Sequence, residues 1–252
     1  MALAGVAAAD ITWDESQSYK YTWDFSATSV LGGNVTNTFD VATSDGRTYI
    51  TDTTPKNGDK KVYREDNTSF LYNAVEAAVN SNATLTLTLD YYYVESQWGQ
   101  TILHVGRGGN GVAYGMTFGV AGYGYLSVTS AFTNDANLAA AQSNVQLTKD
   151  AWNTITFTLS NNKWTASNGT TTSDAVTLGA INWDTEDASE NRKYSIAIPA
   201  PGWESQGCSG LNDSGCKIAN MTVSFTPAVP EPTTATLSLL ALAGLAARRR
   251  RK

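Results

Sequence analysis

Charged residues, histidine and cysteine are all scarce in this 252-residue chain, and each shortage argues against a class of function. Charged residues make up 16% of the chain, against about 25% in typical globular domains. His104 is the only histidine and lies in an apolar stretch, where a structural role is expected. One histidine cannot build a His-rich metal site, and a catalytic triad around it would need unusual partners.

The chain also lacks a basic surface in its main part. Its net charge is −6, but residues 248–252 are all basic, so the rest of the chain is still more acidic. An acidic body repels nucleic acid, and no basic patch with interleaved aromatic residues is visible. We therefore expect no nucleic-acid partner.

The two cysteines, Cys208 and Cys216, lie in one loop that is rich in glycine and serine. Such a loop bends easily, so in an exported protein the two sulfurs are expected to form a disulfide. A pair of thiols is the alternative. A zinc site is disfavoured because two thiolates need further Cys or His ligands.

The first nine residues are small and apolar, and they stop at Asp10. Ala7-Ala8-Ala9 fits the small-residue cleavage site of a secretory signal, although the basic region of a complete signal is missing. We interpret residues 1–9 as the remnant of a signal peptide whose true start lies upstream. The alternative is an ordinary alanine-rich start.

The carboxyl terminus has three parts in a fixed order. Pro230-Glu231-Pro232 is followed by an uncharged, mostly apolar run, 235–247, and then by Arg248, Arg249, Arg250, Arg251 and Lys252. As a helix this run is about 20 Å long, which is short for the roughly 30 Å core of a bilayer. The basic cluster is expected to stay on the cytoplasmic side.

Residues 229–252 resemble the PEP-CTERM sorting tail of Gram-negative bacteria, which carries the same three parts in the same order. The resemblance implies export across the inner membrane and recognition by an exosortase-type transpeptidase. Under it Pro230, Glu231 and Pro232 are the recognition residues and Arg248 to Arg251 are the basic stop. Such tails often accompany the production of extracellular polysaccharide.

Between the two ends, residues 10–226 read as one all-β domain. Thr84-Leu85-Thr86-Leu87-Thr88-Leu89 alternates polar and apolar residues with period two, and Trp152 to Leu159 does the same. Asn161-Asn162 and Asn168-Gly169 predict turns, and only 71–79 looks helical. Further strands are expected at 113–120, 123–128, 193–198 and 217–225. The fold class is therefore a two-sheet antiparallel β-sandwich with a short, hydrophobic C-terminal helix in 227–252.

Residues 84 to about 225 resemble the laminin-G/concanavalin A-like jelly roll. The segments that carry the resemblance are the long strand Leu85 to Val94, 101–106, 125–128, and above all the turn and strand from Leu147 to Phe157. The resemblance implies a tendency to bind glycans or proteins.

Catalytic and metal-binding patterns are weak. Retaining glycosidases need two carboxyl groups about 5–5.5 Å apart, and alternate residues on one strand can provide them. Glu186-Asp187-Ala188-Ser189-Glu190 comes nearest, but its first two acids are adjacent and the segment reads as a loop. Asp184, Glu186 and Asp187 are the candidate ligands for Ca²⁺, although the spacing of a helix-loop-helix site is absent. No other cofactor is expected.

Three aromatic residues in polar or glycine-rich segments are the candidate carbohydrate-binding residues: Trp98, Tyr123 and Trp203. A sugar ring stacks its C–H face on such a side chain, while nearby amides and carboxylates bind its hydroxyls. The alternative is that each ring closes one end of the core. Trp13, Trp23, Trp152, Trp164 and Trp183 are expected to be core residues.

These observations favour an exported cell-envelope protein with a non-catalytic jelly-roll domain that binds glycans or matrix. One alternative is a purely structural envelope protein without a small ligand, and another is a polysaccharide-degrading enzyme. The expected location is the outer surface of a Gram-negative bacterium, after transient insertion of the tail into the inner membrane.

Overall fold

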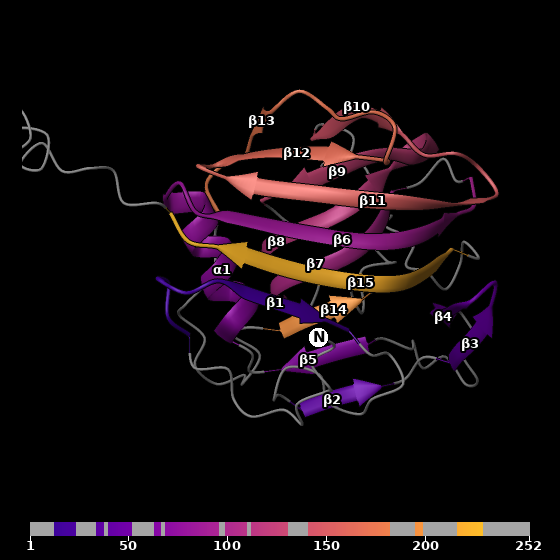
Figure 1. Cartoon of the computed structure of the whole chain (residues 1–252), viewed down its shortest axis with the longest axis horizontal. Coiled ribbons are helices and arrows are strands. Elements are labelled where there is room, and N and C mark those ends of the chain that lie inside the picture. The colour runs from indigo at the N-terminus through magenta and orange to yellow at the C-terminus, as the bar shows by residue number, and fades with distance from the viewer. Residues whose placement is uncertain are drawn as a thin grey trace, which may run out of the picture.

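The structure is a computed structural model that describes the following parts of the chain. These are residues 13–23, 34–37, 40–51, 63–66, 69–95, 99–109, 112–130, 141–181, 195–198 and 216–228. Two antiparallel sheets stack face to face and one helix closes a side of the stack (Figure 1). The predicted two-sheet antiparallel β-sandwich is confirmed.

The front sheet in Figure 1 has the strand order β13-β12-β11-β6-β15-β4-β3. In addition, β1 pairs with the C-terminal half of β15, from Thr222 to Phe225. Its strands are β1 (Tyr19–Thr22), β3 (Asp40–Ser44), β4 (Arg47–Thr51), β6 (Thr84–Tyr93), β11 (Ala151–Ser160), β12 (Lys163–Ser167), β13 (Val176–Thr177) and β15 (Lys217–Thr226).

The back sheet has the order β10-β9-β8-β7-β14-β5-β2. Its strands are β2 (Asn34–Asn37), β5 (Tyr63–Asp66), β7 (Gln100–Gly109), β8 (Val112–Ala121), β9 (Tyr125–Thr129), β10 (Gln142–Gln146) and β14 (Ser195–Ile198).

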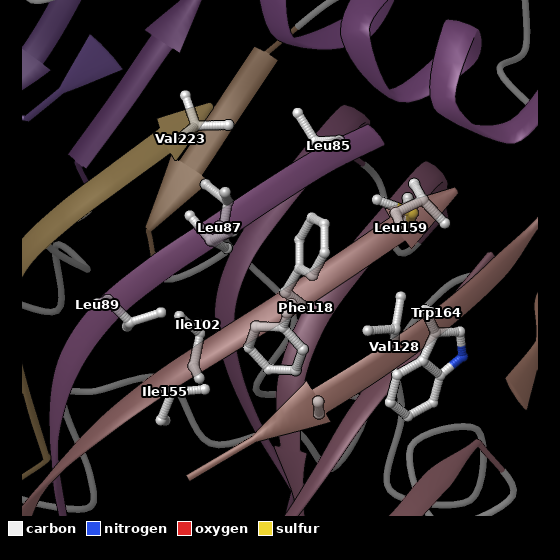
Figure 2. Close-up of a cluster of buried hydrophobic side chains, with 14 of the residues drawn as sticks. Leu85, Leu87, Leu89, Ile102, Phe118, Val128, Ile155, Leu159, Trp164 and Val223 are labelled. Carbon is white, nitrogen blue, oxygen red and sulfur yellow. The ribbon is translucent and has the colours of Figure 1, made fainter. Parts of the chain in front are cut away.

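The core lies between the sheets because strand side chains alternate between the two faces. On β6 the leucines 85, 87 and 89 are buried, and on β11 Ile155, Phe157 and Leu159 are buried opposite them in register. Phe118 of β8 meets Phe157 with ring centroids 5.3 Å apart. Figure 2 shows Phe118 among the aliphatic side chains of this core. Each of these side chains stabilises the fold by about 1.5–3 kcal/mol through burial.

The helix α1 (Ser69–Asn80) covers one side of the sandwich. Its buried residues Leu71, Ala74, Val75 and Ala78 recur with the spacing of one helical face. The helix ends at Asn80, where the Ser81 hydroxyl donates a hydrogen bond to the Ala77 carbonyl. The helix predicted over 71–79 is confirmed with slightly wider bounds.

Two hairpin turns use residues that tolerate positive φ. Asn161 and Asn162 join β11 to β12 with φ of 50° and 55°, as the sequence predicts. Asp45 and Gly46 join β3 to β4 with φ of 52° and 71°. This second hairpin was not predicted, although Asp-Gly is a strong turn signal.

The position of Trp152 differs from the prediction. It was expected in the core, but it shares the outward face of β11 with Thr154 and Thr156 and is only half-buried. Trp23 and Trp164 are core residues as expected, 4% and 1% exposed.

The two ends of the sandwich differ in what meets there. β6 ends at Tyr93 where β7 begins at Gln100, β11 begins at Ala151 and β15 begins at Lys217. We call this the Tyr93 end. β15 then runs the length of the sheet and finishes at Thr226, paired with Thr84, at the opposite end.

Candidate functional site

Tyr123 stands at the Tyr93 end, in the turn Gly122–Gly124 between β8 and β9. It is 58% exposed, and it is the only exposed large hydrophobic side chain in the described part of the chain. Its backbone has φ 62°, a conformation that costs energy for a residue with a side chain. The fold therefore holds a large aromatic ring in solvent at a fixed place.

Two features of its surroundings explain why the turn Gly122–Gly124 keeps its backbone conformation. A Cβ on Gly124, which has φ 86°, would lie 2.7 Å from Cε1 of Tyr93, so only glycine fits against that ring. The Gln146 side chain donates a hydrogen bond from Nε2 to the Tyr123 carbonyl at 2.7 Å. Tyr123 is thereby tied to both sheets.

Trp98 and Trp203, the other two predicted sugar-binding residues, lie outside the described residues. Trp98 belongs to the connection from β6 to β7, and Trp203 to the connection from β14 to β15. Cys216, the last residue of the second connection, accepts a hydrogen bond from the Val94 amide in the first at 3.3 Å. Both connections therefore join the sandwich at the Tyr93 end.

Cys216 belongs to a buried polar cluster beneath this end. Its Sγ lies 3.1 Å from Oε1 of Gln100, and the Tyr91 hydroxyl donates a hydrogen bond to the same oxygen. Burial raises the pKa of Tyr91 well above its ordinary value, so the hydroxyl keeps its proton. Cys208 lies outside the described residues, and its disulfide with Cys216 stays a prediction.

A second surface lies on the outer face of the front sheet beside the Tyr93 end. We call it the aromatic–cationic patch, and its residues are Arg47, Tyr49, Tyr92, Trp152 and Lys217, of which Tyr49 is buried and the other four are half-buried. The Trp152 ring meets Tyr49 and Tyr92 in edge contacts, with centroids 5.8 Å and 5.6 Å away. The Arg47 guanidinium lies 5.0 Å from the Trp152 centroid, and the Lys217 ammonium lies 5.0 Å and 4.7 Å from those of Tyr49 and Tyr92.

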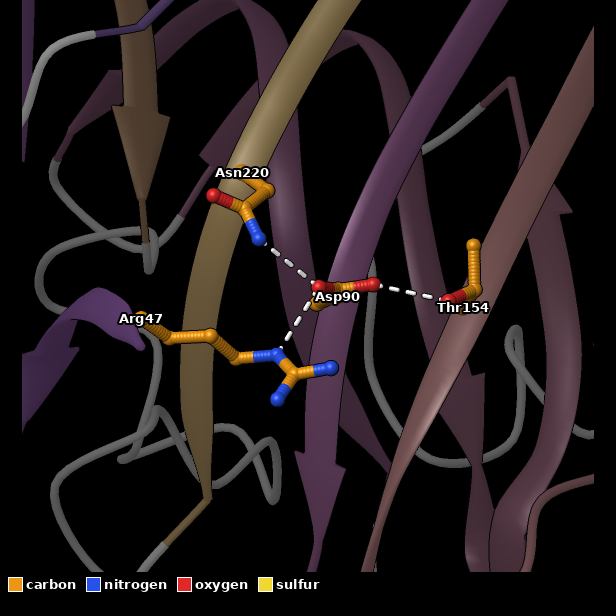
Figure 3. Close-up of polar contacts among 4 residues, drawn as sticks. All are labelled: Arg47, Asp90, Thr154 and Asn220. Atoms are coloured by element: carbon orange, nitrogen blue, oxygen red, sulfur yellow. Dashed lines mark hydrogen bonds and ion pairs between the residues drawn. The ribbon is translucent and has the colours of Figure 1, made fainter. Parts of the chain in front are cut away.

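Asp90 of β6 holds Arg47 of this patch in place (Figure 3). Arg47 Nε donates to Oδ2 at 2.9 Å, Asn220 Nδ2 donates to the same oxygen at 2.8 Å, and the Thr154 hydroxyl donates to Oδ1 at 2.8 Å. The four residues come from four different strands, β4, β15, β11 and β6. The carboxylate thus fixes the guanidinium over the Trp152 ring.

The surroundings of Asp90 decide its protonation. Burial acts to raise its pKa, but the hydrogen bonds from Asn220, Thr154 and Arg47 together with the Arg47 charge outweigh burial, and the net pKa is lowered. A carboxylate held ionised in this way is a poor general acid. It is also the only buried acidic side chain among the described residues, so it has no buried carboxylate partner there.

The turn before β11 positions Trp152. The Asn153 amide accepts a hydrogen bond from the Thr148 amide at 2.8 Å and donates to the carbonyls of Thr148 and Ala151 at 3.0 Å and 2.9 Å. Lys149 in the same turn pairs with Glu95 after β6. These contacts fix where β11 begins and which face Trp152 joins.

The remaining candidate residues do not gather into a site. His104 is 1% exposed and its Nδ1 lies 2.9 Å from the Thr117 hydroxyl, which fits the structural role expected for it. No cluster of His, Cys, Asp or Glu in the described ranges is placed to hold a metal ion. The proposed Ca²⁺ ligands Asp184, Glu186 and Asp187 lie outside those ranges.

The sequence did not indicate the patch. Arg47 and Asp90 are 43 residues apart, and they meet because β4 and β6 both pair with β15. One signal was available: Trp152 has the same strand parity as Thr154 and Thr156, whereas the apolar set is Ile155, Phe157 and Leu159. That parity places Trp152 outside the core.

The sorting motif (230–232) and the basic stop lie outside the described residues, but residues 228–252 match the family model described as the PEP-CTERM protein-sorting motif. The fold and tail together define an all-β protein that is exported, transiently anchored in the membrane and sorted to the cell surface by an exosortase. Within the described residues no helix has both the length and the apolar character needed to cross a bilayer. No curated protein matches the sequence.

Two solved structures that this chain resembles are distant in sequence. Trypanosoma rangeli sialidase in complex with the inhibitor DANA is 11% identical with a TM-score of 0.43, covering 76% of this chain and 26% of the sialidase chain. A protein of unknown function from Shewanella oneidensis MR-1 is 11% identical with a TM-score of 0.47, covering 88% of this chain and 93% of its own. This chain therefore spans about a quarter of the sialidase, and neither likeness bears on activity.

Proposed function

We propose that this protein is a non-catalytic binding module that contacts extracellular glycan from the cell envelope of a Gram-negative bacterium. The binding surface is the Tyr93 end of the sandwich. The sorting tail supplies the delivery of the domain to the outside, and the domain supplies the contact with the glycan.

One observation carries the proposal: the exposed ring of Tyr123 stands where the connections containing Trp98 and Trp203 join the sandwich. A sugar ring presents apolar C–H groups on one face, and an exposed aromatic ring is the side chain that stacks on that face. A ring held in solvent by a strained turn is maintained at a cost in stability, as binding residues often are.

The absence of catalysis is part of the proposal. Asp90 is ionised and has three hydrogen-bond donors, so it is suited to orient its neighbours rather than to transfer a proton. Glycoside hydrolysis needs a second carboxyl group within about 5–10 Å. An assay for newly formed reducing ends, with the full chain and a panel of polysaccharides, is expected to give no product.

A glycan array probed with the full chain tests the binding. We expect Tyr123→Ala to weaken binding by roughly tenfold, because stacking of one ring contributes about 1–1.5 kcal/mol. Tyr125→Ala is the matched control, since Tyr125 is also a tyrosine of this turn region but is half-buried. Tyr123→Phe should bind like the wild type if stacking is the main contact.

The purely structural alternative predicts a different result. A protein that acts only by being displayed binds no glycan on the array, and its Tyr123→Ala variant behaves as the wild type in every assay. If Tyr123→Ala leaves glycan binding unchanged, the Tyr93 end is not the binding site.

A further inference from the structure

We infer that the aromatic–cationic patch recognises an acidic sugar unit, so that the ligand of this protein is an acidic polysaccharide. This inference rests on the proposed glycan-binding function and names the class of glycan. The patch is distinct from Tyr123: it lies on the outer face of the front sheet, beside the Tyr93 end at which Tyr123 stands.

The first support is the charge of the patch. Lys217 forms no ion pair within the described residues, and its ammonium lies over two tyrosine rings. Arg47 uses only its Nε for Asp90, and its two terminal nitrogens have no carboxylate among the described residues (Figure 3). Among the described residues, two cations against one carboxylate give the patch a positive charge, in a chain whose net charge is −6.

The second support is the surface around the patch. The outward positions of the three central strands β15, β6 and β11 carry, besides the patch and the Asp90 cluster, only threonine and serine. These positions are Thr84, Thr86, Thr88, Thr156, Thr158, Ser160, Thr222, Ser224 and Thr226. An acidic polymer can therefore lie along this face without meeting an exposed carboxylate on these strands, while the threonine hydroxyls can bind sugar hydroxyls.

The third support is the order of the side chains across the sheet. The register Lys217↔Tyr92↔Trp152 places a cation, a phenol and an indole in one row on three neighbouring strands. Neighbouring strands are about 4.8 Å apart, so the row spans about 10 Å. An acidic pyranose carries an apolar C–H face and a negative group on one ring, which matches ring side chains beside cations.

Carboxylated and sulfated glycans share this chemistry, and the experiment separates them. The full chain is titrated with polygalacturonate, dextran sulfate and neutral dextran. We expect polygalacturonate or dextran sulfate to bind, neutral dextran to bind at least about fivefold more weakly, and the difference to shrink between about 0.05 and 0.5 M NaCl.

Lys217→Gln is the variant that tests the patch, and Lys163→Gln is its control. Lys163 is an exposed lysine on the outward face of β12 in the same sheet, so its substitution changes the net charge equally. We expect Lys217→Gln to weaken binding of the acidic polymer roughly fivefold, and Lys163→Gln to change it less than about twofold. Lys217→Arg should keep the affinity, and thermal unfolding of each variant shows that it is folded.

The outcomes separate the two proposals. Equal affinity for dextran and the acidic polymers, or equal effects of Lys217→Gln and Lys163→Gln, overturns the inference while a loss of binding in Tyr123→Ala keeps the proposed function. Failure to bind any polysaccharide, neutral or acidic, overturns both. Should Lys217→Gln not fold, the salt dependence of the wild type alone decides the inference.

Discussion

At the scale of single residues, Asp90 joins four strands of the front sheet through one carboxylate. Its oxygens accept hydrogen bonds from Arg47, Thr154 and Asn220, and its side chain is 12% exposed. Hydrogen bonds to a charged, largely buried group contribute about 1.5–3 kcal/mol each at most. The cost of removing the charge should therefore be measurable and depend on pH.

We predict that Asp90→Asn lowers the free energy of unfolding by about 2 kcal/mol at pH 7. The pKa of Asp90 is lowered in the folded protein, so its contribution is complete above the unfolded-state value of about 3.9. The contribution is lost as the pH falls through the folded-state pKa. Urea unfolding at pH 7 and at about pH 3 should show a smaller difference between variant and wild type at the lower pH.

Asp174→Asn is the control for this series, because Asp174 is an exposed carboxylate in the connection between β12 and β13. Its effect should stay below about 0.5 kcal/mol at both pH values. A difference for Asp90→Asn that is equally large at both pH values would contradict the assigned charge of the carboxylate.

At the scale of elements, the turn between β8 and β9 is shaped by the space around one glycine. Gly124 and Gly46 both have positive φ, but only at Gly124 would a Cβ meet another side chain, the Tyr93 ring at 2.7 Å. At Gly46 nothing lies within 4 Å. A comparison of alanine substitutions at these two glycines separates the cost of the backbone conformation from the cost of steric overlap with Tyr93.

We predict that Gly46→Ala costs about 1 kcal/mol of stability, the cost of placing alanine at positive φ. Gly124→Ala should cost about 2–4 kcal/mol, because overlap with Tyr93 adds to the same backbone cost. Thermal or urea unfolding of both variants measures the difference. Equal losses of stability in the two variants would mean that the Tyr93 ring moves aside without a cost in free energy.

Elements of the fold follow from local sequence to different degrees. The alternation in Thr84 to Leu89 and the Asn161-Asn162 turn predicted β6 and the β11–β12 hairpin, because both depend on neighbouring residues alone. Trp152 was predicted to be a core residue, but it lies on the outward face of β11 because it has the same strand parity as Thr154 and Thr156. The Asp90–Arg47 pair could not be predicted, because it depends on how distant strands pair through β15.

At the scale of the whole molecule, the sorting motif in 228–252 controls where the domain arrives. We predict that replacing Pro230, Glu231 and Pro232 with alanine leaves the protein in the inner-membrane fraction, because the sorting enzyme no longer recognises the tail. Cell fractionation with immunoblotting measures the shift. Glu15→Ala, a change at an exposed residue of the folded domain, serves as the control.

Export of the triple-alanine variant at the wild-type level would contradict a recognition role for these three residues. Intact-mass measurement of the exported protein answers the separate question of the cysteines. A mass lower by about 2 Da than that of the reduced chain shows the Cys208–Cys216 disulfide, since one bond removes two hydrogen atoms.

The direction of β15 has a consequence for how the domain is presented to its surroundings. The strand begins at Lys217, inside the patch, and reaches Thr226 ten residues later, just before the tail. Ten strand residues span about 33 Å, nearly the full height of the sandwich. Because β15 ends next to the tail, the Tyr93 end, where we propose that the glycan binds, lies at the end of the sandwich opposite the point where the chain continues into the sorting motif.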